Sequence, residues 1–300
     1  MASAPLSDTP PRVVGHLERL AETDAHEGPV YVADEDALYF TTVRRESVAI
    51  KRLLLADGSV TVVRADANMA NGMALDLDGR LVVCEQGTRS EPARLTRVAR
   101  DTGVAETLVS GWSGHALNSP NDVVVGSDGA VWFTDPSYGH LQGFRPEPEL
   151  GDFVYRYDRT ARELTVVADW FDKPNGLAFS PDERVLYVGD SGAVHAPGDY
   201  DASRPRRVVA FDVADGELAN GRIFADSIPG FPDGIKTDSA GRVYVSAATG
   251  VLVFAPDGER LGEIELPGAV NFALAGSNED LLLVTADTAV WAAHLTRKGA

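Results

Sequence analysis

The sequence returns six times to one pattern: a polar residue, a short apolar strand, a turn rich in Asp or Gly, and a second apolar strand. The copies start 44, 50, 54, 58 and 38 residues apart, at Glu27, Asn71, Asn121, Asn175, Asp233 and Asn271. Self-similarity at such a period is typical of chains built from repeated supersecondary units. The repeat therefore limits the fold more than any other feature of the chain.

Each copy predicts a β-hairpin followed by further strands. Turns such as Asp78-Gly79 and Asp128-Gly129 join runs rich in Val, Leu, Tyr and Phe, which is typical of hairpins. More strand-like runs follow several copies, for example residues 153–158 and 164–168. Helical periodicity is weak, so the repeat predicts an all-β fold, a six-bladed β-propeller with a central metal site.

The six copies are expected to form one domain over residues 12–300, because all-β folds of this length occur as single units. Residues 1–11 hold three prolines among small polar neighbours, and we expect a flexible lead-in there. The run 12–17 is expected to add a strand to the last blade and so to close the ring.

Charge and composition argue against several partners. The chain has 27 basic and 45 acidic residues, a net charge of −18, and its field repels nucleic acid and anionic lipid surfaces. No stretch reaches the roughly 18 to 20 apolar residues that span a bilayer. The single cysteine, Cys84, cannot form an internal disulfide, which favours a cytoplasmic location. The sequence gives no indication of oligomeric state.

The first strand of each propeller blade lines the central channel, so the six residues that begin the copies are expected to meet on the axis. They supply two carboxylates and four carboxamides. Two close carboxylates repel each other unless a cation neutralises them. Hard oxygen donors suit Ca²⁺ best, with Mg²⁺, Mn²⁺ or Zn²⁺ as alternatives. The pattern predicts a site for one divalent cation.

A second interpretation stays open, because Asn, Asp and Glu before Gly or Pro are common turn formers. Turn chemistry alone accounts for any single copy. It gives no reason for the charges of Glu27 and Asp233, which the ring of ligands explains.

Longer motifs at these positions resemble those of a known family. They are Glu-Gly-Pro-Val at 27–30, Asn-Ser-Pro-Asn-Asp-Val at 118–123, Trp-Phe-Thr-Asp-Pro at 132–136, Lys-Pro-Asn-Gly-Leu-Ala-Phe-Ser-Pro-Asp at 173–182 and Pro-Asp-Gly at 232–234. Together they resemble the gluconolactonase, regucalcin (senescence marker protein) and luciferin-regenerating enzyme family, and the bacterial gluconolactonase-like members most of all.

The resemblance implies a divalent-metal hydrolase, commonly of sugar lactones, with metal ligands at Glu27, Asn121, Asn175 and Asp233. It also implies that Asp233 is the catalytic base. Two departures limit the transfer: Ser119 stands where regucalcin-like members carry a sugar-binding arginine, and Gln86 stands where gluconolactonase-like members often carry a histidine.

Several residues near the ring are expected to contact the substrate: Asn71, Gln86, Asn121, Asp135 and His195. The long connections 138–151 and 192–207 are expected to shape the pocket, because function often lies on loops held by a rigid scaffold. Asp122 directly follows the start of the third copy, and His115 and His140 lie in connecting segments that could reach the mouth of the channel, but the sequence assigns these three residues no role.

The sequence therefore predicts a divalent-metal-dependent lactonase, a carboxylic ester hydrolase that opens a small lactone, such as the sugar lactone gluconolactone. The metal would polarise the carbonyl, and Asp233 would accept a proton from the attacking water. Two alternatives stay open: a phosphotriesterase, other esterase or isomerase on the same metal ring, and a non-catalytic calcium-binding propeller. The expected partner is a small lactone or ester.

Overall fold

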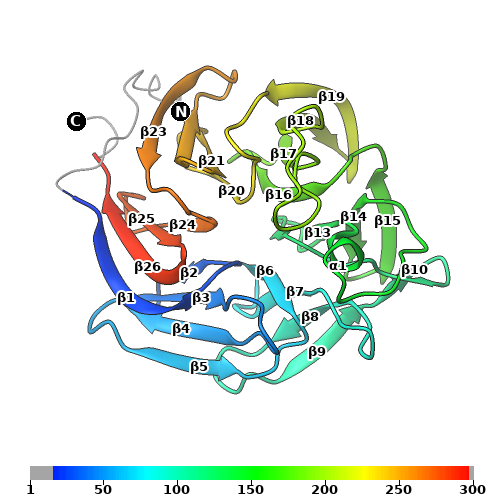
Figure 1. Ribbon diagram of the computed structural model, residues 1–300, viewed down its shortest axis with the longest axis horizontal. Helices are drawn as coiled ribbons and strands as arrows, with labels where there is room; N and C mark the ends of the chain where they lie inside the picture. Colours follow the sequence, from blue (N-terminus) through cyan, green and yellow to red (C-terminus); the bar gives the residue numbers. More distant parts are fainter. Residues whose placement is uncertain (1–15, 297–300) are drawn as a thin grey trace.

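The computed structural model describes residues 16–296, and the predicted lead-in of residues 1–11 lies outside them. Six four-stranded antiparallel sheets are arranged around a central axis (Figure 1). The predicted all-β, six-bladed propeller is confirmed. Within residues 16–296, no helix has the length and apolar character needed to cross a membrane.

The blades follow one another in chain order, and each begins with its inner strand. Blades 1 to 3 consist of β2 (Val30–Val32), β3 (Ala37–Thr41), β4 (Ile50–Leu54) and β5 (Val60–Arg64); β6 (Ala70–Leu75), β7 (Leu81–Glu85), β8 (Arg94–Val98) and β9 (Ala105–Val109); and β12 (Val123–Val125), β13 (Val131–Asp135), β14 (Phe153–Asp158) and β15 (Glu163–Ala168).

Blades 4 to 6 repeat the arrangement. They consist of β16 (Pro174–Phe179), β17 (Val185–Asp190), β18 (Arg207–Ala214) and β19 (Glu217–Ala225); β20 (Ile235–Thr237), β21 (Val243–Ala247), β22 (Gly250–Phe254) and β23 (Arg260–Glu265); and β24 (Asn271–Ala275), β25 (Leu281–Thr285), β26 (Asp287–His294) and β1 (Glu18–Ala25). The hairpin of β10 (Gly111–Trp112) and β11 (His115–Ala116) and the short helix α1 (Tyr138–Leu141) lie in connections.

The ring closes because the first strand of the chain joins the last blade (Figure 1). β1 pairs antiparallel with β26, with Glu22 opposite Ala289 and Ala25 opposite Asp287. This closing strand lies later than the predicted run 12–17: residues 16 and 17 precede it, and residues 12–15 lie outside the described part. β1 is an outer strand with exposed charged side chains, which are common on sheet edges, so no apolar run marks it in the sequence.

Six apolar clusters hold the blades together, one between each pair of neighbours. Strand β13 shows why its sequence is so apolar: Val131 and Phe133 pack toward blade 2, whereas Trp132 packs toward blade 4. The Phe133 ring stacks on Tyr155 with centroids 5.1 Å apart. A strand buried on both faces reads as a continuous apolar run, and this explains why the second strand of each copy is conspicuous.

Hydrogen bonds also join neighbouring blades close to the axis. The Thr134 hydroxyl of blade 3 donates to the Asn175 carbonyl of blade 4 over 2.8 Å. Four other blades make a similar link, from Thr41 to the Asn71 carbonyl, Ser191 to that of Pro232, Ser246 to that of Val270 and Thr285 to that of His26. Each hydroxyl thus satisfies a carbonyl that lies in or shortly before the inner strand of the following blade.

Cys84 takes the corresponding position in blade 2. Its side chain is fully buried in the cluster between blades 2 and 3. Burial, together with the charges of Asp122 and Asp135, raises the pKa of its thiol well above the ordinary value. Because the thiolate is the reactive form, Cys84 acts as a small apolar residue of the core.

Glycine follows four of the six residues that begin the copies, because the blades approach one another there. A Cβ atom at Gly176 would lie 2.0 Å from the Asp233 carbonyl oxygen, and one at Gly28, where φ is +57°, would lie 2.5 Å from that of Asn71. Only glycine fits such contacts. Asn71 and Asn175 lie inside strands, so turn chemistry does not account for them.

We predict that Thr134→Val lowers the free energy of unfolding by about 1 to 3 kcal/mol. The valine would leave the Asn175 carbonyl without its donor, and the amide of Asp122, which donates to the threonine oxygen over 3.1 Å, without its acceptor. Thr61→Val on the exposed outer strand β5 is the matched control. Denaturant titration of both variants tests the prediction, and equal losses would contradict it.

Candidate functional site

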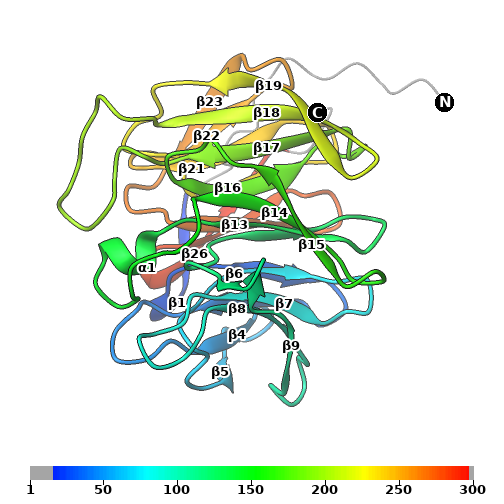
Figure 2. The ribbon, with the colours of Figure 1, turned by 90° about the vertical axis from the view of Figure 1, so that its right-hand side faces the viewer.

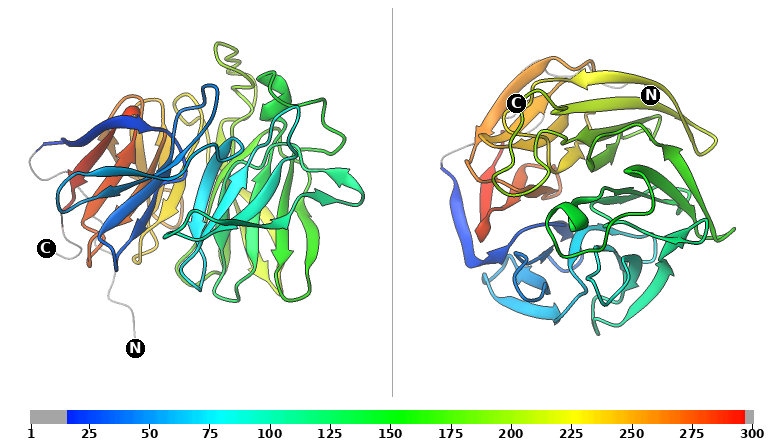
Figure 3. Two further views of the ribbon diagram at one scale, coloured as in Figure 1. Left: turned by 90° about the horizontal axis from the view of Figure 1, so that it is seen from below. Right: turned by 45° about the vertical axis from the view of Figure 1, so that its right-hand side comes forward.

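A cavity of about 530 Å³ lies on the axis at one face of the propeller. Five of the six residues that begin the copies line it: Glu27, Asn71, Asn121, Asn175 and Asp233. Helix α1 and the loop 192–206 project from this same face (Figures 2 and 3). Parts of both contribute to the lining, as expected for the long connections. We call this space the axial cavity.

Amide side chains hold the acidic residues of the axial cavity in place. Asn271, the sixth member of the ring, does not face the cavity but donates from Nδ2 to Glu27 Oε2 over 2.8 Å. The amide of Gly28 donates to the same oxygen over 2.9 Å. Asn175 hydrogen-bonds the carboxylate of Asp233. The ring is thus a connected polar network rather than six separate side chains.

A third carboxylate, Asp122, lies beside the two that the repeat predicts. Burial and then the charge of Asp122 raise the pKa of Glu27. Burial and then the charge of Glu27 raise the pKa of Asp233 well above its ordinary value. Burial also raises the pKa of Asp122, against the opposing effect of Lys236, whose Nζ lies 3.8 Å from Asp122 Oδ2. Three carboxylates and one ammonium would leave two negative charges when all are ionised.

The donor atoms at this site fit a hard divalent cation. Asn121 Oδ1 is a buried oxygen in the cavity lining without a hydrogen-bond partner among the described residues, an arrangement that is rare unless a ligand compensates it. Between residues 16 and 296, no three His, Cys, Asp or Glu side chains form a metal-binding group. A cation here would therefore need amide oxygens beside the carboxylates, a mixed set that Ca²⁺ accepts.

Asp135, expected to contact substrate, lies outside the axial cavity lining and is fully buried. Its two carboxylate oxygens accept hydrogen bonds from the amides of Asn118 and Ser119, each over 2.8 Å. These amides belong to the segment that leads directly to Asn121. Burial raises the pKa of Asp135 to about 7, although both hydrogen bonds act in the opposite direction. In this position Asp135 fixes the backbone that presents Asn121.

Asp190 has the same role in blade 4, a role that the sequence did not indicate. Its Oδ1 accepts hydrogen bonds from the amides of Asp172 and Lys173 over 3.2 and 3.0 Å. Those residues stand three and two positions before Asn175, as Asn118 and Ser119 stand before Asn121. The signal was present, because Asp190 ends the second strand of its copy as Asp135 does.

The remaining predicted contacts divide into two groups. Gln86 lines the axial cavity together with Asn71. His195 does not: its Nε2 lies 3.1 Å from Asp172 Oδ1, and its Nδ1 lies 2.8 Å from Arg204 Nη1. His195 therefore organises the loop 192–206, whose neighbouring residue Val194 does reach the cavity.

His26 is a cavity residue that sequence reasoning missed. Its Nδ1 lies 2.7 Å from Asp287 Oδ1. Burial lowers the pKa of His26, but the hydrogen bond to Asp287 and the charge of Glu27 outweigh burial and raise it above its ordinary value. Its position directly before Glu27 was the one available signal, because a lone histidine carries no metal-binding spacing.

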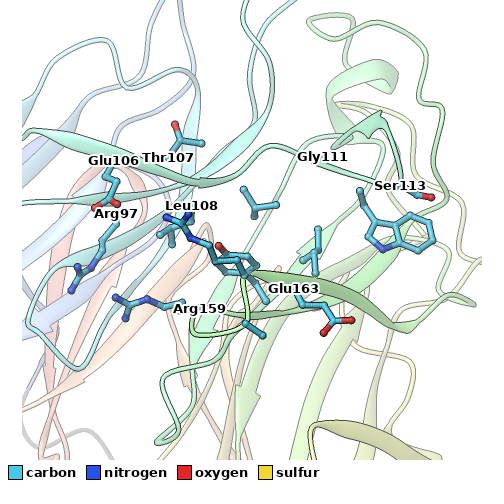
Figure 4. A pocket seen from close by; sticks show the side chains of 14 residues that line it. Arg97, Glu106, Thr107, Leu108, Gly111, Ser113, Arg159 and Glu163 are labelled. Atoms are coloured by element: carbon cyan, nitrogen blue, oxygen red, sulfur yellow. The ribbon is translucent and has the colours of Figure 1, made fainter.

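A larger cavity, of about 950 Å³, lies on the outside of the ring between blades 2 and 3 (Figure 4). Strands β9 and β15 contribute to its lining. Two of its arginines, Arg97 and Arg159, form ion pairs with Asp76. It contains none of the residues that begin the copies. We attribute it to the gap between two diverging blades and place the functional site in the axial cavity.

Comparisons with known proteins find matches over most of the chain. The family model described as the SMP-30/Gluconolactonase/LRE-like region matches residues 25–288. Lactonohydrolase oryL of Aspergillus oryzae is 30% identical over 286 residues, and the gluconolactonase of Zymomonas mobilis is 30% identical over 262 residues. These alignments cover 87% and 79% of this chain but 65% and 68% of the two relatives.

A solved structure matches nearly the full length of the chain. A gluconolactonase from Xanthomonas campestris superposes with a TM-score of 0.81 at 35% identity, and the match covers 97% of each chain. The similarity thus extends over all six blades.

We predict that Asp135→Asn changes how stability depends on pH. The pKa of Asp135 in the folded protein, about 7, exceeds that of an unfolded aspartate. Its contribution to the free energy of unfolding is therefore present at low pH and is lost as pH rises toward 7. The stability of the native protein relative to the variant should therefore fall between pH 5 and pH 8, by about 1 to 3 kcal/mol. Denaturant titration at both pH values measures this difference.

The exposed Asp101→Asn substitution is the matched control and should show no comparable trend. A constant difference between the native protein and Asp135→Asn across this pH range would contradict the prediction.

Proposed function

The chain belongs to the SMP-30/gluconolactonase/LRE-like family, and on that premise we propose that it is a divalent-cation-dependent lactonase that opens a small lactone to its hydroxy acid. One observation carries the proposal: Glu27, Asn121, Asn175 and Asp233 line one axial cavity. Relatives named gluconolactonase and lactonohydrolase support the lactone as the substrate class. A sugar lactone such as gluconolactone is the first compound to test.

The cation would be held by Glu27, Asn121, Asn175 and Asp233, and Ca²⁺ suits this set best. The unpartnered oxygen of Asn121 and the two buried carboxyl groups, whose pKa values burial and neighbouring charge raise, favour the binding of a cation. When bound, the cation supplies charge that polarises a carbonyl and stabilises a developing oxyanion. Lys236 balances Asp122, which leaves the carboxylates of Glu27 and Asp233 to be neutralised by the cation.

Asp233 is the residue we assign as the base. It lines the axial cavity and remains partly accessible, whereas Glu27 is only 4% exposed. The hydrogen bond from Asn175 orients its carboxylate. An aspartate is a weak base, but one held against a bound water and substrate gains from proximity. The proton it accepts from water is the one that the ring oxygen needs when the C–O bond breaks.

Other cavity residues would bind and orient the lactone. Gln86 offers both a donor and an acceptor, and His26 lies next to Glu27 with one ring nitrogen engaged by Asp287. Tyr138 from α1 covers part of the cavity and would exclude bulk water. An esterase, a phosphotriesterase, an isomerase or a calcium-binding propeller without catalysis could use the same ring, and the lactone is preferred because of the relatives.

We predict that Asp233→Asn lowers kcat on the best lactone by roughly 10²- to 10⁴-fold, the usual effect of losing a general base. Hydrolysis is followed by proton release in weak buffer. The exposed Asp226→Asn substitution serves as the control and should retain the native rate. An unchanged kcat in Asp233→Asn, with the fold intact by circular dichroism, would remove Asp233 as the base.

We also predict that chelation abolishes lactone opening and that Ca²⁺ restores it. Ca²⁺ at 100 times its Kd should stabilise the chelated protein by about 2.7 kcal/mol, measured as a rise in Tm. Glu27→Gln should lose most of this rise, and the exposed Glu46→Gln should keep it. A chelated protein that retains both its full rate and its Tm would contradict the cation site.

A further inference from the structure

Arg44 is a positive side chain inside the axial cavity of a strongly acidic protein. It lies in the connection between β3 and β4 and belongs to the cavity lining. Its Nη1 donates to Gln142 Oε1, and its guanidinium lies 4.4 Å from the centroid of the Phe144 ring. No carboxylate forms an ion pair with it among residues 16–296. One hydrogen bond leaves most of the five donors of this arginine unused.

Two other arginines near this face have partners within the protein. Arg145 is buried and donates to four backbone carbonyls. The neighbouring Arg45 points to the outside and pairs with Asp24 over 2.9 Å. Arg44 therefore differs from its neighbours in keeping donors available toward a cavity.

Holding the charged guanidinium of Arg44 in this position is unfavourable without an anionic partner. Burial lowers the pKa of its guanidinium, and a partly desolvated cation is stabilised chiefly by a paired anion. Phe144 fixes the plane of the guanidinium through a cation–π contact, so the remaining donors have a defined direction. A guanidinium held in one plane suits two-point recognition of a carboxylate.

The lining around the ring residues is mixed. Its apolar members include Val43, Val48, Met69, Val194, Ala196, Pro197 and Phe231. Its polar members outside the ring include His26, Arg44, Gln86 and Gln142. A lactone covered by hydroxyl groups on all sides would leave polar groups against the apolar members. A lactone with one anionic substituent and an otherwise apolar ring would satisfy both.

We propose that Arg44 binds a carboxylate substituent of the substrate, so that the substrate class is a lactone that carries a carboxylate outside its ring. This inference rests on the proposed function and narrows it. Hydrolysis consumes one water, breaks the ring C–O bond and gives a hydroxy-dicarboxylate. Arg44 supplies a local positive charge against the net charge of −18, which otherwise repels an anionic substrate.

The test compares two lactones that differ only at one substituent: 5-oxotetrahydrofuran-2-carboxylate and γ-valerolactone, which has a methyl group in place of the carboxylate. The native protein should prefer the carboxylate compound in kcat/KM. Arg44→Met should reduce the ratio of the two kcat/KM values by roughly 10- to 100-fold, mainly through KM, the size expected for a charge-assisted hydrogen-bonded pair. Arg44→Lys should retain part of the preference.

Arg45→Met is the matched control and should keep the native ratio. The proposal is overturned if Arg44→Met leaves the ratio unchanged, or if the native protein prefers γ-valerolactone. Opening of γ-valerolactone without preference for the carboxylate compound would refute the role of Arg44 and leave the lactonase proposal standing.

A binding measurement separates the two proposals without any turnover. Isothermal titration with 2-hydroxyglutarate and with 4-hydroxypentanoate, the two ring-opened products, should show tighter binding of the dicarboxylate to the native protein and the loss of this difference in Arg44→Met. Equal binding of both products by the native protein overturns the role of Arg44. A protein that opens no lactone but still shows the Arg44-dependent difference refutes the lactonase proposal alone.

Discussion

The burial of each second strand on both faces is the constraint on which the rest of the structure depends. A blade whose β13 directs Phe133 to one neighbour and Trp132 to the other cannot be stable alone. It needs a blade on each side. A row of such blades leaves an apolar face exposed at each end until the row closes into a ring. Pairing of β1 with β26 provides that closure. The axis, and everything assembled on it, follows from the closed ring.

Closure places the starts of six inner strands in one small volume, and this creates an electrostatic problem. Burial raises the pKa of Glu27, Asp122 and Asp233. In addition, the charge of Asp122 raises the pKa of Glu27, and the charge of Glu27 raises the pKa of Asp233. The protein resolves part of this internally, through Lys236 beside Asp122 and Asn271 beside Glu27. The remaining two negative charges and the unpartnered oxygen of Asn121 are what we assign to a cation.

The site is divided between a rigid centre and variable loops. Asp135 and Asp190 hold the segments before Asn121 and Asn175 through pairs of backbone hydrogen bonds, so the centre tolerates little displacement. Arg44 and Gln142 lie in connections on the cavity face. A propeller can thus keep the chemistry of its centre and change its substrate through the loops, as other scaffolds do.

The sequence by itself determined the number of blades, the order of the strands and the six residues that begin the copies, because these depend on local apolar runs that recur along the chain. It located Glu27 and Asp233 as the charged members of the ring. It placed the closing strand too early, because β1 is a polar edge strand whose identity depends on its distant partner β26. It did not resolve Asp135 as a residue that fixes backbone amides, nor Asp122 as the third carboxylate.

Tertiary structure alone decided those roles, and it alone brought Arg44 and His26 into the axial cavity. The repeat shows only the residues that the blades have in common. The contacts of Lys236 with Asp122 and of Arg44 with Phe144 instead join residues from different copies at positions that the copies do not share. Such contacts depend on how the ring closes and where the loops lie across it, and no periodic pattern in the chain encodes them.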